Sequence, residues 1–197
     1  MSEARDTPHR MTPDEFFEWQ REQDRNYELV DGIAVLAPKA MTGASRRHDT
    51  ITVNILRVLG NKLVGGPCEP HTADMTVLNP NGNVRRPDVT IDCTSGSDES
   101  MQTEEPRVIV EVLSPSTMNF DRFRKVEEYK TNEHIQVVLL VASQSAEVIV
   151  WRRGGAEWRS EIVETLDAMI ALPEIGCELS LSDIYRGSGV ADKPTNW

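Results

Sequence analysis

The feature that most restricts the fold is an apolar run at residues 107–113. This run is rich in valine and isoleucine and is interrupted only by Glu111. Such a composition is typical of a strand at the centre of a sheet that is covered on both faces. Pro115 follows the run and ends it, because proline has no amide proton to continue the ladder. A buried carboxylate needs a cation or hydrogen-bond donors, so Glu111 is a candidate functional residue.

The rest of the chain combines helical and strand patterns around this run. Thr12, Pro13 and Glu15 form the pattern of a helix start with a capping box, and Asp31-Gly32 favours the type I′ turn of a hairpin. The order of elements predicts an α/β or α+β fold with a mixed sheet. The expected helices follow Thr12 and cover 45–63, 119–131 and 181–185; the expected strands cover 27–30, 33–37, 72–78, 88–93, 107–113, 136–142, 146–152 and 158–163.

Length and composition narrow the class of protein. A chain of 197 residues predicts one domain at 12–186, with a flexible lead at 1–11 and a flexible tail at 187–197. The longest apolar run falls far short of the roughly 20 residues of a membrane-spanning helix, and residues 1–11 lack the apolar stretch of a secretory signal. We therefore expect a cytoplasmic protein that does not contact membranes.

Charge and cysteine content exclude further classes. The 21 basic and 32 acidic residues give a net charge of -11, so the average field of the protein repels polyanions, and any nucleic-acid contact needs a local basic surface. Cys68, Cys93 and Cys177 lie far apart and form no CxxC motif, which argues against a disulfide framework or a zinc knuckle. They are interpreted as small apolar residues of the core.

A second acid, Asp88, follows Pro87 at the start of a predicted strand. If this strand neighbours the run at 107–113, the carboxylates of Asp88 and Glu111 face one point. Their repulsion would raise the pKa of one of them, and a divalent cation would remove that penalty. Two carboxylates with water and a phosphate suit Mg²⁺ or Mn²⁺ better than Zn²⁺. Alternatively, Asp88 ends a turn, and Glu111 pairs with Arg86 or Arg107.

Four blocks of the sequence resemble a known family. They are Tyr-Glu-Leu-Val-Asp-Gly at 27–32, His48 in the following helix, Arg-Pro-Asp-Val at 86–89, and Val-Glu-Val-Leu-Ser-Pro-Ser-Thr at 110–117. Blocks of this kind in this order are similar to the Uma-type family, a large bacterial family described as endonucleases. The resemblance extends from about Thr12 to Tyr185. It implies the restriction-endonuclease-like fold of the PD-(D/E)XK superfamily, a mixed sheet flanked by helices with an N-terminal helix and hairpin.

The resemblance assigns roles to residues of this chain. Asp88 and Glu111 would be the metal-binding acids, together with the backbone carbonyl of Val112. The superfamily places a lysine two residues after the second acid, but this chain has Leu113 there. In Uma-type sequences the lysine lies on the next helix, which makes Lys125 the candidate that positions the attacking water or stabilises charge on the phosphate.

The same helix carries the other residues of this pattern. Asp121 and Tyr129 match the family spacing around Lys125, and Lys130 is a second candidate lysine. A surface ion pair between Asp121 and Lys125 at i,i+4 is the alternative interpretation.

Residues of the first half of the chain are further candidates. Glu28 matches an acidic position of the family hairpin and would complete the site, whereas Asp31 is interpreted as a turn residue. His48 lies on the apolar side of its helix, so it is either a core histidine or an accessory site residue. Six arginines flank the site elements and could form a local basic rim for nucleic acid: Arg46, Arg47, Arg85, Arg86, Arg122 and Arg124.

The function expected from the resemblance is that of a Mg²⁺-dependent endonuclease, with Mn²⁺ as a substitute, that hydrolyses phosphodiester bonds of nucleic acid, in the first place DNA. The alternative is a catalytically weak or inactive relative that acts as a binding or regulatory module, because Leu113 replaces the usual lysine. A glycosidase with two carboxylates fits the neighbouring arginines poorly. We expect a homodimer, since symmetric pairs are the commonest assemblies.

Overall fold

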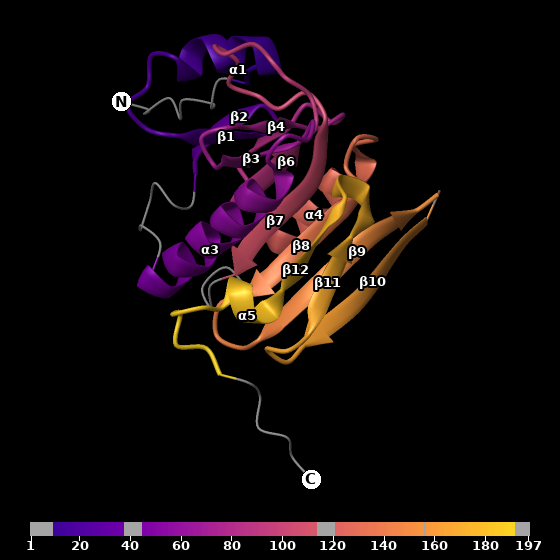
Figure 1. Ribbon diagram of the computed structural model, residues 1–197. Helices are drawn as coiled ribbons and strands as arrows, with labels where there is room; N and C mark the ends of the chain where they lie inside the picture. The colour runs from indigo at the N-terminus through magenta and orange to yellow at the C-terminus, as the bar shows by residue number, and fades with distance from the viewer. Residues whose placement is uncertain (1–9, 38–44, 114–120, 156, 192–197) are drawn as a thin grey trace.

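A six-stranded mixed sheet forms the centre of the protein (Figure 1). The computed structural model describes residues 10–37, 45–113, 121–155 and 157–191. The strand order is β10-β9-β8-β7-β6-β3; β7 and β8 are parallel and the other neighbours are antiparallel. The strands are β3 (Glu69–Thr72), β6 (Val89–Asp92), β7 (Pro106–Leu113), β8 (Val137–Ala142), β9 (Glu147–Gly154) and β10 (Glu157–Glu164).

The sheet is covered on both faces, as the apolar run predicted. Helix α3 (Arg46–Leu63) packs with Val108, Val110 and Val112 in one buried cluster, whereas α4 (Asp121–Thr131) packs with Ile109 and Leu113 in another. Alternate residues of β7 therefore face opposite helices, which is the period of a strand. The α/β fold class with a mixed sheet is confirmed.

A smaller sheet and α1 (Pro13–Gln20) lie above α3 and β7 in the view of Figure 1. Thr12 and Glu15 form the expected capping box, and Asp31 and Gly32 both have positive φ, as a type I′ turn requires. The order of this sheet is β2-β1-β5-β4. Its strands are β1 (Tyr27–Val30), β2 (Ile33–Leu36), β4 (Val77–Leu78) and β5 (Val84–Arg85).

A third unit closes the face of the central sheet that α3 covers. The hairpin β11 (Met169–Leu172) and β12 (Cys177–Ser180) encloses the short 3₁₀ helix η2 (Pro173–Ile175), and α5 (Leu181–Ile184) follows. Their apolar side chains join the cluster under α3. No helix among the described residues is long and apolar enough to cross a bilayer.

Several expectations about local structure were wrong. The strand expected at 72–78 is divided between β3 and β4, which belong to different sheets. Strands β5, β11 and β12 were not predicted. Cys68 and Cys93 form a disulfide rather than filling the core as separate thiols. The pairing follows from the register, because Glu69 lies opposite Asp92 and the next pair outward is Cys68 and Cys93.

Candidate active site

The two candidate metal-binding acids lie side by side. Strands β6 and β7 are antiparallel with Val89 opposite Val110, so the next positions, Asp88 and Glu111, also lie opposite each other. The Val112 amide donates a hydrogen bond to Asp88 Oδ2 at 2.7 Å. Asp88 is buried, with 2% of its surface exposed. The condition that the sequence left open, that the two strands be neighbours, is thus met.

Helix α3 brings His48 to the same point. Ser45 caps this helix and accepts a hydrogen bond from the His48 amide, which places His48 in the first turn. The imidazole Nε2 lies 3.2 Å from Asp88 Oδ1. His48 therefore lies next to the site, beside one carboxylate oxygen of Asp88.

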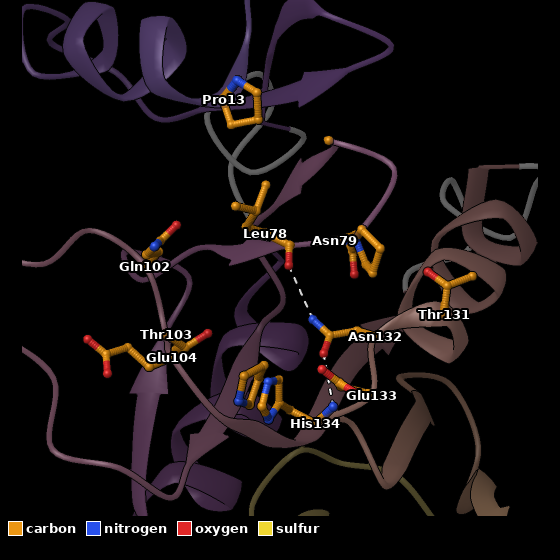
Figure 2. Close-up of a pocket in the computed structure, with 13 residues that line it drawn as sticks. Pro13, Leu78, Asn79, Gln102, Thr103, Glu104, Thr131, Asn132, Glu133 and His134 are labelled. Atoms are coloured by element: carbon orange, nitrogen blue, oxygen red, sulfur yellow. Dashed lines mark hydrogen bonds between the residues drawn. The ribbon is translucent and has the colours of Figure 1, made fainter.

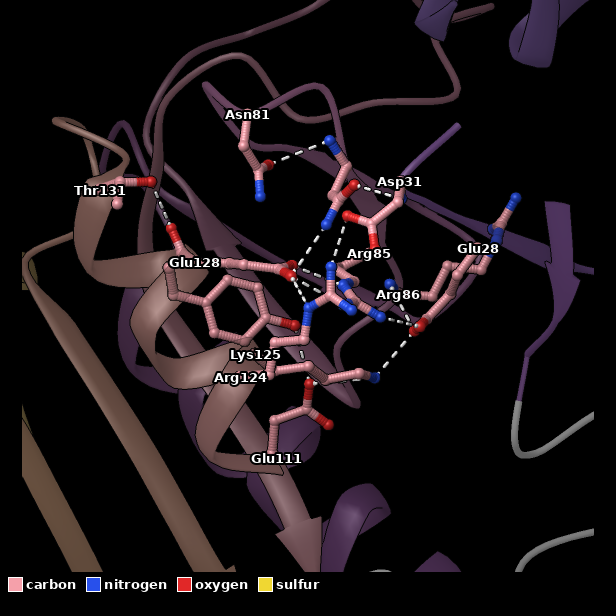
Figure 3. A network of polar contacts seen from close by, with 12 residues as sticks. Glu28, Asp31, Asn81, Arg85, Arg86, Glu111, Arg124, Lys125, Glu128 and Thr131 are labelled. Atoms are coloured by element: carbon pink, nitrogen blue, oxygen red, sulfur yellow. Dashed lines mark hydrogen bonds and ion pairs between the residues drawn. The ribbon is translucent and has the colours of Figure 1, made fainter. Parts of the chain in front are cut away.

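Helix α4 supplies a cation and a hydroxyl group. Lys125 Nζ lies 2.8 Å from Glu28 Oε1 and 3.7 Å from Glu111 Oε1 (Figure 3). Tyr129 donates a hydrogen bond to Glu111 Oε1 at 2.8 Å. Lys125 and Tyr129 are four residues apart, so they share one face of the helix. The alternative in which Lys125 forms a surface pair is wrong, because Lys125 is buried at 8% exposure.

The buried charges shift one another's pKa values. Burial raises the pKa of Glu111; Lys125 opposes this shift, while Asp88 and Glu28 add to it. Burial disfavours charged Lys125, but Glu111 and Glu28 outweigh it and raise the pKa of Lys125 above its ordinary value. Burial alone would raise the pKa of Glu28, but Lys125 and Arg85 lower it. The surrounding charges thus favour the ammonium form of Lys125 and the ionised form of Glu28.

Tyr129 remains a neutral donor. Burial and the nearby carboxylate of Glu111 raise the pKa of Tyr129 well above its ordinary value. Its hydroxyl group therefore keeps its proton and fixes one oxygen of Glu111 at neutral pH.

A second layer of charge, which was not predicted from the sequence, holds Glu28 in place. Arg85 is 1% exposed; its Nη1 lies 3.0 Å from Glu28 Oε2 and its Nε lies 2.7 Å from Glu128 Oε2 (Figure 3). Asn83 donates to Glu128 Oε1 at 2.8 Å. The spacing of Lys125, Glu128 and Tyr129 at i, i+3 and i+4 could have revealed one polar helix face turned inwards.

Comparison with known proteins assigns the chain to a family. The profile of the Uma2 family, described as "Putative restriction endonuclease", matches residues 13–182. The chain belongs to the Uma2 family. An uncharacterized Synechocystis protein, slr1290, is 33% identical over 181 residues, which cover 90% of this chain and 93% of the relative. A second uncharacterized Synechocystis protein, sll1609, is 25% identical over 135 residues, covering 66% of this chain and 74% of that protein.

A solved structure has the same fold as this Uma2 protein. It is described as a putative nuclease belonging to DUF820 from Anabaena variabilis, and it matches with a TM-score of 0.70 at 18% identity. The match covers 89% of this chain and 97% of that chain. At this identity the likeness is evidence for the fold.

The prediction that arginines next to Asp88 form an exposed basic rim is wrong for Arg85 and Arg86, because both are buried. Arg86 is 4% exposed, and its guanidinium donates to the backbone carbonyls of Tyr27, Ala73 and Asp74. It ties β1 to the loop before β4 and does not present charge to a nucleic acid. Arg85 is likewise buried, in the pairs with Glu28 and Glu128.

The other candidate arginines differ in exposure. Arg46 is exposed at the start of α3. Arg47 donates to the Ser188 carbonyl and to Gln144. Arg124 pairs with Asp31 and Glu128 and is 37% exposed. Of these three guanidinium groups, only that of Arg46 has no partner among the described residues. The side chain of Arg122 lies outside the described residues.

The remaining candidates fall outside the cluster. Lys130 pairs with Glu127 and stacks on Trp151 with its Nζ 3.5 Å from the ring centroid, so the second candidate lysine turns towards β9. The side chain of Asp121 lies outside the described residues. Arg107 pairs with Glu105 at 3.6 Å, and the alternative pairing of Glu111 with an arginine is therefore wrong.

The donor set fits a hard divalent cation. Two carboxylates lie opposite each other, and burial together with the neighbouring acids raises the pKa of Glu111, a penalty that a cation would remove. Among the described residues no group of three or more His, Cys, Asp and Glu side chains could hold a metal. Mg²⁺ tolerates this, because it commonly binds one or two carboxylates and completes its shell with water and phosphate.

A cavity lies away from this cluster. It has a volume of about 750 Å³ and is bounded by Leu78, the loop at 102–104 and the end of α4 (Figure 2). Asn132 donates to the Leu78 carbonyl across it at 3.2 Å. None of Asp88, Glu111 and Lys125 lines this cavity.

Proposed function

We propose that this Uma2 protein is a Mg²⁺-dependent endonuclease that hydrolyses phosphodiester bonds of DNA. The observation that carries the proposal is the opposed pair Asp88 and Glu111 with the Lys125 ammonium 3.7 Å from Glu111. Membership of a family described as "Putative restriction endonuclease" supports a nuclease, and the solved structure with the same fold is described as a putative nuclease.

Asp88 and Glu111 would hold the cation, and the Val112 carbonyl would add a backbone ligand. When bound, Mg²⁺ polarises the phosphate and lowers the pKa of a coordinated water. The protein orients both acids: the Val112 amide donates a hydrogen bond to Asp88 beside His48, and the Tyr129 hydroxyl group donates one to Glu111. Outer partners of this kind typically contribute about 10- to 100-fold to metal affinity or activity.

Lys125 acts as a donor and not as a general base. Its raised pKa keeps the ammonium protonated at neutral pH, so it can orient the attacking water and stabilise negative charge that develops on the phosphate. Glu28 fixes the ammonium at 2.8 Å, and Arg85 fixes Glu28. This chain of contacts positions the cation before the substrate arrives.

The position of Lys125 on α4 also explains why a lysine is not needed at position 113, where this chain has Leu113. Leu113 lies on the same face of β7 as Glu111 and packs in the cluster beneath α4. Lys125 reaches the second acid from the helix above this face. The replacement of the usual lysine is therefore no argument for an inactive relative, and we favour the enzyme over a binding module.

The net charge of -11 makes the cation more important for binding. A divalent ion between Asp88 and Glu111 would neutralise charge where the scissile phosphate enters. Arg46, exposed at the start of α3 near His48, is the basic residue best placed to add a phosphate contact. We therefore expect weak binding of DNA without Mg²⁺ and a shallow dependence of that binding on salt, because few basic side chains are free to contact phosphates.

The test is cleavage of single-stranded DNA, double-stranded DNA and RNA by the full chain with Mg²⁺, Mn²⁺ or EDTA. Asp88→Ala is the test variant. Asp98→Ala, in an exposed loop, is the matched control. Circular dichroism verifies that both variants fold. The proposal predicts metal-dependent cleavage of DNA by the parent and the control, with loss in Asp88→Ala.

Three results would contradict the proposal. Equal cleavage by the parent and Asp88→Ala would exclude this site, cleavage in EDTA would exclude the metal, and cleavage of RNA alone would exclude DNA as the substrate. Binding of DNA without cleavage under every condition would favour the binding module.

A further inference from the structure

Strand β10 is an open edge of the central sheet. It ends the strand order and pairs only with β9 among the described strands (Figure 1). Most of its residues are exposed, including Ile162 with 61% of its surface. An eight-residue edge of this kind offers a row of unpaired backbone groups to another chain.

The hairpin geometry shows which backbone groups face outward. Gly154 pairs with Glu157 across a loop of two residues. Residues that flank such a loop exchange both of their hydrogen bonds, and the pattern then alternates along the strand. Trp158, Ser160 and Ile162 therefore turn their N–H and C=O groups away from β9.

We propose that β10 pairs antiparallel with β10 of a second copy of this chain, about a two-fold axis at Ser160. This axis lies perpendicular to the sheet and keeps equivalent faces of both copies on one side. Even-numbered residues of one copy therefore lie opposite even-numbered residues of the other, and odd-numbered opposite odd-numbered. The outward N–H and C=O groups of one copy thus meet the outward groups of the other. Both sheets become one continuous sheet.

Charge selects this register among its neighbours. With the axis at Ser160, Arg159 lies opposite the partner's Glu161, and Glu161 lies opposite the partner's Arg159. Shifting the axis by one residue places either Arg159 or Glu161 opposite its own copy, which sets like charges against each other. Within the described residues neither side chain has an ion-pair partner in the single chain.

Apolar contacts support the same register. Trp158 lies opposite the partner's Ile162, on the sheet face that α4 covers. Trp158 already packs with Ile149 and Trp151 on that face. Pairing would therefore extend an existing apolar surface and cover the exposed Ile162.

The assembly closes after two copies. The same edge is used by both chains, so the interface is isologous and leaves no second β10 edge for growth. The opposite edge of each sheet is β3, which has a different sequence. The structure thus fits a discrete dimer and not a filament.

The experiment measures the mass of the full chain by light scattering after gel filtration across a range of concentrations. The variants are Arg159→Glu and Glu161→Arg, alone, combined in one chain, and as a mixture of the two single variants. Glu99→Arg, in an exposed loop, is the control for a change of net charge. Circular dichroism and thermal melts verify the fold of every variant.

We expect the parent and the control to be dimers and each single variant to lose about tenfold or more in dimer affinity. The double variant restores the dimer, because the opposed charges are exchanged. The mixture also forms dimers, since one variant then carries two acids at these positions and the other carries two arginines, so that opposite charges meet at both pairs.

A parent that is monomeric at every concentration would overturn the proposal. A dimer that survives both single substitutions, or species larger than dimers, would overturn it as well. Failure of both the mixture and the double variant to restore association would exclude the register about Ser160.

Discussion

Arg85 is the residue whose removal most directly tests the buried charge network. It is 1% exposed and binds Glu28 at 3.0 Å and Glu128 at 2.7 and 2.9 Å. Arg85→Met keeps much of the length of the side chain but leaves two buried carboxylates without their shared cation. Breaking a buried pair costs about 3–5 kcal/mol.

The remaining contacts set the expected value within this range. Glu28 keeps Lys125, and Glu128 keeps Asn83 and Arg124. We therefore expect a loss of about 3 kcal/mol in the free energy of unfolding. For a chain of this size the melting temperature would fall by roughly 6–12 °C. Urea unfolding followed by tryptophan fluorescence measures the loss.

Arg124→Met is the matched control. Arg124 binds the same carboxylate, Glu128, but is 37% exposed, so its removal is expected to cost at most about 1 kcal/mol. If Arg85→Met were no more destabilising than Arg124→Met, the buried network would not stabilise the fold in the way described.

Three further predictions concern the site and its support. Lys125→Met should lower the DNA cleavage rate by about 10²- to 10³-fold, whereas Lys130→Met should leave it unchanged; equal effects would contradict the role of Lys125. Because the folded pKa of Glu28 lies below its ordinary 4.5, its ionised form stabilises the protein above pH 4.5, and this contribution disappears as the pH falls through the folded pKa. Urea unfolding against pH should show that dependence in the parent and a weaker one in Glu28→Gln. Cys68 and Cys93 are 25 residues apart in the sequence, so reduction of their disulfide should lower the free energy of unfolding by about 3 kcal/mol. Equal melting temperatures with and without reductant would contradict this.

The central features of the fold were predictable because they depend on local patterns. The valine and isoleucine run around Glu111 determines a strand with two covered faces, and β7 has helices on both sides. Thr12 and Glu15 predict the start of α1 from capping alone. The resemblance also gave the residues that meet at the site, since Asp88, Glu111 and Lys125 lie together.

Features that depend on distant register were not predictable. Strands β4 and β5 have two residues each, so they carry no period that a sequence could reveal. Arg86 resembles a surface residue in the sequence, but the fold surrounds it with backbone carbonyls from β1 and the loop before β4. The bridge between Cys68 and Cys93 depends on the pairing of β3 with β6, which spacing alone leaves open.

Anomalous diffraction from a crystal soaked in Mn²⁺ would locate a cation bound by Asp88 and Glu111. We expect one strong peak within about 2.5 Å of carboxylate oxygens of both residues. A well-diffracting soaked crystal with no peak there, or with manganese bound only at other acids of the surface, would contradict it.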